Sequence, residues 1–175
     1  MLGSSEIADR VLRTWRQQDS LWSDFRFRPT PGDREWQDRL CKQATDVARM
    51  LESIRRYGES LQIVNRGLHY GAGEDAVSRA KVFAAFYTFR AARYEEAIAL
   101  AGEALAYEHL SDNSKGRAYH VIGLSRLQLH ERTKDLADLD AAIEALNASV
   151  GADPSMGEAR TLLKALREQR QRLAS

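Results

Sequence analysis

The sequence contains few of the residues that cross-link or interrupt a chain. One cysteine, Cys41, among 175 residues excludes an intramolecular disulfide and a cysteine-rich metal cage. Three prolines leave almost the whole length open to helix, because proline breaks helices. These shortages favour an all-α protein that is held together by packing alone. We expect Cys41 to be a small buried hydrophobe in one of its helices.

Signals for membranes and nucleic acids are also missing. No apolar run approaches the roughly 20 residues of a membrane-spanning helix. The opening stretch MLGSSEIADR lacks the basic region followed by an apolar region that marks a signal peptide. We therefore expect a cytoplasmic protein without membrane contact. The 26 basic and 25 acidic residues nearly cancel, and phosphate contacts dominate affinity for nucleic acids, so the balance argues against a nucleic-acid partner.

Motifs that carry enzyme chemistry do not occur. None of the four histidines forms an HExxH motif or lies three or four positions from another histidine or from Cys41. The GAG at 71–73 is not a phosphate loop, because no strand precedes it and no lysine–serine pair follows. We therefore predict a protein that is not an enzyme and that needs no metal or cofactor.

What the sequence does contain is one segment written twice. Residues 56–70 read RYGESLQIVNRGLHY, and residues 93–107 read RYEEAIALAGEALAY. The arginine–tyrosine pairs match, Glu59 matches Glu96, and Tyr70 matches Tyr107, all 37 positions apart. Two copies in register at a fixed spacing indicate a helical-repeat protein.

Apolar residues recur every three or four positions along most of the chain, as amphipathic helices require. Turn signals separate a leader helix in 1–30, three helix pairs and a polar capping helix. The pairs are expected at about 31–70, 74–108 and 114–150, and the cap at 154–173. We divide the chain into residues 1–30, the leader helix and an aromatic linker, and residues 31–175, the repeat domain. Phe25 and Phe27 of the linker are expected to fill a crevice between the leader helix and the repeats.

The placement of small and aromatic residues in these pairs resembles the tetratricopeptide repeat (TPR) family. That family has small residues inside the first helix, an aromatic at the start of the second, and two small residues along the second. The matching residues are Ala48, Tyr57, Ser60 and Gly67, then Ala85, Tyr94, Ala97 and Ala104, then Gly123, Ala142, Ser149 and Pro154. The chain departs from the family in its periods, which are 37 and then roughly 45 residues against about 34. Its third pair lacks the aromatic and carries an inserted stretch at about 130–137.

The resemblance implies a right-handed superhelix of antiparallel helix pairs, with about three TPR-like repeats between the leader and capping helices. First helices would line a concave groove that holds a peptide. The groove positions carried over from the family are Thr45, Arg49, Glu52, Arg79, Val82, Phe86, Arg90, Arg117, His120 and Leu124. Some family members hold a peptide carboxylate with a lysine–asparagine clamp. Thr45 and Arg49 stand at those positions, so we do not expect this chain to bind chaperone tails.

The expected function is therefore a protein-interaction adaptor or scaffold. The groove arginines suit an acidic protein or peptide partner, and Val82 with Phe86 would hold an apolar anchor. Two interpretations compete with this one: Phe86 packs against the first helix or the linker at 23–30, and each arginine lies on a solvated face with an ion pair inside its own repeat.

Two other functions remain open. One is a nucleic-acid-associated regulator that uses an arginine-rich face. The other is a homo-oligomeric scaffold with Trp15 and Trp22 of the leader helix as its interface. Those tryptophans would otherwise cap the N-terminal end of the repeat array.

Overall fold

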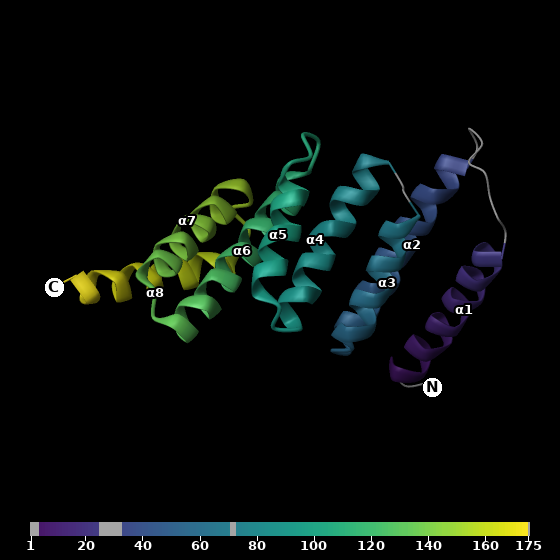
Figure 1. The fold of residues 1–175 in the computed structure, drawn as a ribbon, viewed down its shortest axis with the longest axis horizontal. Helices are drawn as coiled ribbons and strands as arrows, with labels where there is room; N and C mark the ends of the chain where they lie inside the picture. The colour runs from purple at the N-terminus through teal and green to yellow at the C-terminus, as the bar shows by residue number, and fades with distance from the viewer. Residues whose placement is uncertain (1–3, 25–32, 71–72, 175) are drawn as a thin grey trace. The chain divides into compact units, whose positions relative to one another are not determined.

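The computed structural model describes residues 4–24, 33–70 and 73–174, and in these ranges it consists of helices joined by short turns (Figure 1). The helices are α1 (Ser4–Asp24), α2 (Asp33–Ser53), α3 (Tyr57–His69), α4 (Glu74–Arg90), α5 (Tyr94–Leu105), α6 (Asp112–Thr133), α7 (Leu136–Ala152) and α8 (Gly157–Ala174). The all-α class and the eight predicted helices are confirmed. The chain divides into two compact units, residues 1–80 and 81–175, with the boundary inside α4.

Two helix boundaries differ from the sequence expectation. The leader helix, which the sequence predicts from Ser4 to about Ser20, continues to Asp24, and the linker with Phe25 and Phe27 lies outside the described residues. The capping helix begins at Gly157 and not at 154. Its start is delayed because the Asp153 carboxylate accepts hydrogen bonds from the Ser155 amide (2.9 Å) and hydroxyl (2.6 Å), which forms a turn before the helix.

In the unit of residues 1–80, small residues let α2 and α3 approach closely. A Cβ added at Gly67 would lie 2.7 Å from the Ala44 Cβ, so a larger residue there would push the two helices apart. The buried Ser60 hydroxyl donates to the Ala48 carbonyl at 2.9 Å and ties the same two helices together. Cys41 is fully buried, as expected. Burial raises the pKa of its thiol to about 11, and the thiol lies 3.6 Å from the Ala76 carbonyl oxygen.

In the unit of residues 81–175, two hydrophobic clusters form the core. The first joins α4, α5, α6 and the connection between α5 and α6 through Val82, Ala85, Ala97, Ala101, Ala104, Leu110, Ala118 and Val121. The second joins α7 and α8 through Leu139, Ala142, Leu146, Ala159, Leu163 and Leu166. Most of the first cluster is alanine, so its helices pack backbone to backbone with little room for larger side chains.

The two copies of the repeated segment begin with the same backbone turn. Arg55 and Ala92 both adopt a left-handed conformation, with φ of 63° and 59°. In each turn the following residue donates its N–H to a carbonyl five positions back and so closes the preceding helix. These bonds run from Arg56 to Leu51 (2.9 Å) and from Arg93 to Thr88 (3.2 Å).

The matching residues of the two copies also make matching ion pairs. Arg56 binds Glu59 at 2.7 Å, and Arg93 forms an ion pair with Glu96. In the first copy a third residue joins, because Arg56 also binds Asp9 of α1. The repeated arginine and glutamate therefore close the first turn of α3 and of α5, and the first pair additionally holds the leader helix.

Candidate interaction surface

Helix α4 presents only a narrow polar strip beside its buried face. Val82 is 2% exposed and belongs to the core cluster, so it is covered by its own unit. Phe86 is half-buried against that cluster, and its ring lies edge-on to Tyr87 with centroids 5.6 Å apart. Arg90, at the end of α4, is exposed. The surface of this helix therefore combines an arginine with the uncovered part of a phenylalanine.

Helix α6 continues the same kind of surface. Arg117, His120 and Leu124 follow one another at intervals of three and four residues, which places them on one side of the helix. Arg117 is exposed, and its guanidinium carbon lies 5.5 Å from the centre of the Phe83 ring of α4. His120 and Leu124 are half-buried. The contact between Arg117 and Phe83 is a cation–π pair that positions the arginine between the two helices.

His120 contributes no charge to this surface at neutral pH. Desolvation by burial lowers the pKa of its imidazole from 6.5, Glu158 of α8 opposes the shift, and Arg117 adds to it. Its Nε2 atom is buried without a hydrogen-bond partner among the described residues. The positive charge on this side therefore comes from the arginines alone.

We define the α4–α6 face as Phe86, Arg90, Arg117, His120 and Leu124. All five belong to the unit of residues 81–175. Sequence reasoning named these five, but it missed Phe83, which supports Arg117, and Glu158, which faces His120. No spacing in the sequence links Phe83 to Arg117, because their contact depends on how close α4 and α6 lie.

The remaining predicted groove residues lie in the unit of residues 1–80. Thr45 is 2% exposed, and its hydroxyl donates to the Cys41 carbonyl at 2.9 Å. Its hydrogen-bonding capacity is therefore already used within α2. Arg49 is exposed and lies 4.0 Å from Asp46. Arg79 is exposed and Glu52 is half-buried. These side chains are not part of the α4–α6 face as defined above.

The two tryptophans considered for self-association differ in what the structure describes. Trp15 is 8% exposed, so its indole is largely covered within its own unit. The side chain of Trp22 lies outside the described residues. An interface at these tryptophans stays a prediction.

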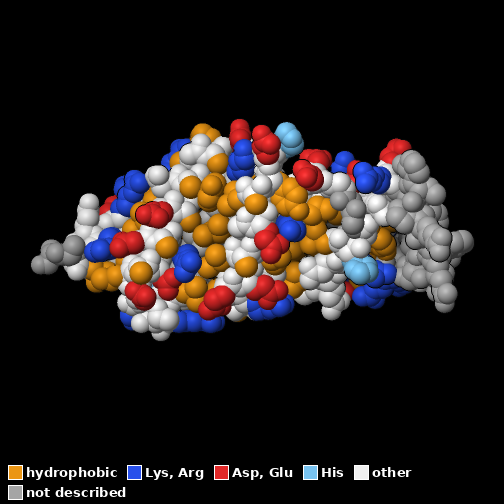
Figure 2. Space-filling model, turned by 45° about the horizontal axis from the view of Figure 1, so that its top comes forward, with side chains coloured by type: hydrophobic (Ala, Val, Ile, Leu, Met, Phe, Trp, Pro, Cys, Tyr) orange, Lys and Arg blue, Asp and Glu red, His pale blue; other side chains and the backbone are white. Residues whose placement is uncertain are grey.

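Charge and metal-binding groups are dispersed. Figure 2 shows basic and acidic side chains interspersed over the face in view, with apolar side chains between them. Among the described residues, no group of three or more histidine, cysteine or carboxylate side chains is arranged to hold a metal ion. None of the described helices has the length and apolar character that a membrane crossing requires.

Antiparallel helix pairs, small residues at the packing seams and a recurring left-handed turn define the chain as an all-α, TPR-like helical repeat protein. The chain is similar to the first TPR domain of the human RPAP3 protein, with a TM-score of 0.60, 16% identity, and 75% of this chain and 92% of that chain covered. It is also similar to the first TPR of Spaghetti (RPAP3) bound to the HSP90 peptide SRMEEVD. There the TM-score is 0.61, the identity 17%, and the coverage 79% and 96%.

At such identities the likeness shows the fold. The sequence matches no protein-family model and no curated protein sequence.

Proposed function

We propose that this protein is a non-catalytic adaptor that binds a peptide segment of another protein on the α4–α6 face. The fold supports the proposal, because a solved structure of the same fold holds a peptide. The observation that carries it is Arg117, which is exposed and held over Phe83 on the same side of α6 as Leu124. A fixed cation beside apolar surface is suited to a peptide with both kinds of side chain.

The charges of this face favour an acidic peptide. Arg90 and Arg117 can each bind a carboxylate through two parallel N–H donors. Phe86 and Leu124 offer the apolar contact, while neutral His120 leaves this side free of further charge. We expect peptides with one or two acidic residues next to an apolar residue.

The proposed binding does not use the lysine–asparagine clamp. Thr45, at one of the two clamp positions, is buried and bound to the Cys41 carbonyl. The acidic residues of the peptide are therefore expected within its sequence, with no requirement for a free C-terminal carboxylate. A peptide and its C-terminal amide should bind equally well.

Selection from a random peptide library displayed on phage tests the proposal. The parent protein should enrich peptides with aspartate or glutamate beside leucine or an aromatic residue. The double variant Arg90→Glu, Arg117→Glu should lose them. The control Arg160→Glu, Lys164→Glu makes the same charge change at exposed positions of α8 and should keep them.

Far-ultraviolet circular dichroism confirms that all three proteins are folded. If the parent enriches no common sequence, or if the Arg90/Arg117 variant retains the peptides of the parent, the α4–α6 face is not the binding surface. Affinity of the enriched peptides should fall modestly with salt, whereas a steep linear loss would indicate a binding surface for phosphate backbones.

A further inference from the structure

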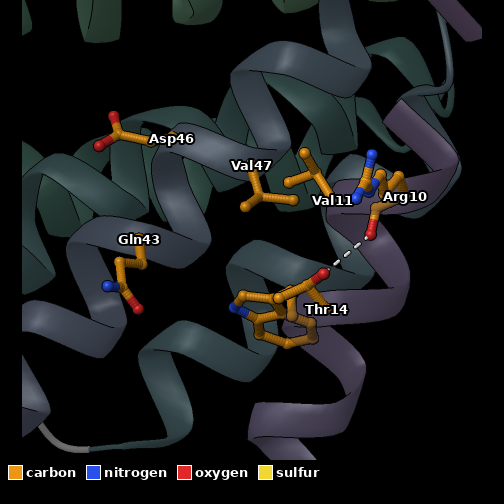
Figure 3. A pocket seen from close by; sticks show the side chains of 7 residues that line it. Arg10, Val11, Thr14, Gln43, Asp46 and Val47 are labelled. Carbon is orange, nitrogen blue, oxygen red and sulfur yellow. Dashed lines mark hydrogen bonds between the residues drawn. The ribbon is translucent and has the colours of Figure 1, made fainter. Parts of the chain in front are cut away.

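A cleft opens between α1 and α2 within the unit of residues 1–80. Its volume is about 360 Å³, and it is lined by Arg10, Val11, Thr14, Trp15, Gln43, Asp46 and Val47. Figure 3 shows Val11 of α1 and Val47 of α2 pointing toward each other across it. The α4–α6 face does not include any of these residues.

The leader helix, which forms one side of the cleft, is also fastened to α3. Asp9 binds Arg56, and Arg16 lies 3.8 Å from Glu59, both at the first turn of α3. The apolar side of α1 is buried within its own unit through Ala8, Leu12 and Trp15. The neighbouring flank of α1, which holds Val11, is left beside the open space.

One large apolar side chain next to the cleft is exposed. Ile7 lies one helical turn before Val11 and is 46% exposed. A protruding isoleucine therefore lies next to an open apolar cleft that can receive a side chain of the same kind. Such a surface is complementary to a second copy of itself, which is the property of a two-fold symmetric interface.

The two sides of the cleft carry opposite charges, so two copies of the cleft can also pair with each other through their charged side chains. Figure 3 shows Arg10 on the α1 side and Asp46 on the α2 side. The Arg10 guanidinium has no ion pair or hydrogen bond with another described residue, although its carbonyl accepts from the Thr14 hydroxyl. Asp46 lies 4.0 Å from Arg49, at the limit of an ion pair. Each copy therefore offers one cation and one anion that a partner can pair more closely.

We propose that two copies of this chain dimerise through their α1–α2 hairpins and form a four-helix bundle. Ile7 on the leader helix of each copy inserts into the cleft of the other and fills its apolar part beside Val11 and Val47. Arg10 and Asp46 line opposite sides of one cleft. A two-fold axis along the helices places Arg10 of each copy opposite Asp46 of the other.

Light scattering coupled to size-exclusion chromatography gives the first test. The parent should show twice the 19.8 kDa mass of the chain at high concentration and dissociate on dilution. Ile7→Glu should raise the dissociation constant about tenfold or more, the effect of burying an unpaired charge at an interface. The control Leu173→Glu changes a side chain that is 55% exposed on α8 and should leave the constant unchanged.

Exchanging the charges of Arg10 and Asp46 gives the second test. It shows whether these two residues pair between two copies or within one chain. Arg10→Glu alone and Asp46→Arg alone should each weaken the dimer about tenfold or more. An equimolar mixture of the two variants should recover it, because both ion pairs of the mixed dimer have opposite charges. Pairing within one chain would not be repaired by mixing.

The proposal is overturned by a single-chain mass at every concentration, or by a mixture no tighter than its components while both variants are folded. It is independent of peptide binding, since the phage selection depends on α4 and α6 alone.

Discussion

The turns before α3 and α5 share one design, and the turn before α7 has another. In the first two, an arginine with no side-chain cap starts the helix and pairs with the glutamate three residues later. In the third, Lys134 is left-handed with φ of 62°, and Asp135 caps α7 by accepting from the Ala137 amide at 2.9 Å. The repeated sequence therefore encodes a repeated turn, and where the sequence changes, a different cap takes over.

The third pair also uses its additional length to support the second. Helix α6 continues into the inserted stretch and ends at Thr133. In this stretch Arg132 lies with its guanidinium carbon 4.5 Å from the centre of the Tyr94 ring. Just before it, the Gln128 side-chain oxygen accepts a hydrogen bond from the Tyr94 hydroxyl at 3.2 Å. The third pair has no aromatic residue at this position of its own, but its inserted stretch contacts the corresponding aromatic of the second pair, Tyr94. The irregular repeat is explained by a contact inside the unit of residues 81–175.

Overpacking the regular seam should have the largest effect. Ala97 is fully buried in the alanine-rich cluster, whereas Ala99 on the same helix is exposed. Ala97→Leu should lower the free energy of unfolding by about 3 kcal/mol, at the upper end for overpacking, because three added carbons have no space. Urea denaturation measures the change, with Ala99→Leu as the control. Equal midpoints for the two variants would show that this side of α5 is not a tight seam.

A smaller effect separates two glycines of the second helices. Gly67→Ala places a Cβ against Ala44 and should destabilise by about 1 kcal/mol, because a backbone must move. Nothing lies within 4 Å of a Cβ at Gly102, so Gly102→Ala should stabilise by about 1 kcal/mol through helix propensity. Thermal unfolding of both variants checks the opposite signs, and shifts of one sign would refute the close approach of α2 and α3.

Buried threonines of the two first helices should respond in opposite directions by less than about 1 kcal/mol. Thr45 and Thr88 are both almost wholly buried. The Thr45 hydroxyl is hydrogen-bonded, whereas Thr88 Oγ1 has no partner among the described residues. Thr88→Val should therefore stabilise the protein, and Thr45→Val should weaken it slightly. A loss of stability in Thr88→Val would mean that its hydroxyl is bonded in solution.

The smallest expected effect is on the melting temperature, when an ion pair is removed from either of the two matching turns. The hydrogen bond from Arg56 holds the pKa of Asp9 below its ordinary 3.8. A depressed folded-state pKa gives stability that is present above about pH 4 and is lost as the pH falls through the folded value. Asp9→Asn should lower the melting temperature slightly at pH 7 and not at pH 2. Glu96→Gln, in the more exposed copy, should change it less at pH 7.

The sequence predicted the helices well because their signals are local. The spacing of apolar residues and the matching arginine–tyrosine segments lie within each helix and its turn. Burial depends instead on neighbours. Val82 and Phe86 are adjacent on one side of α4, yet only the structure shows that Val82 is covered by the cluster and that Phe86 is partly open. The support of Arg117 by Phe83 depends on the distance between two helices, which no spacing within either one defines.

The closed turns at Arg55 and Ala92 have a consequence for how the chain folds. The backbone hydrogen bonds that shape the first of them join residues 51–60, a stretch of only ten positions. Contacts so short in sequence cost little loop entropy, so they form early and quickly. Each helix hairpin is then able to assemble as soon as its own residues leave the ribosome, before the rest of the repeat array has been synthesised.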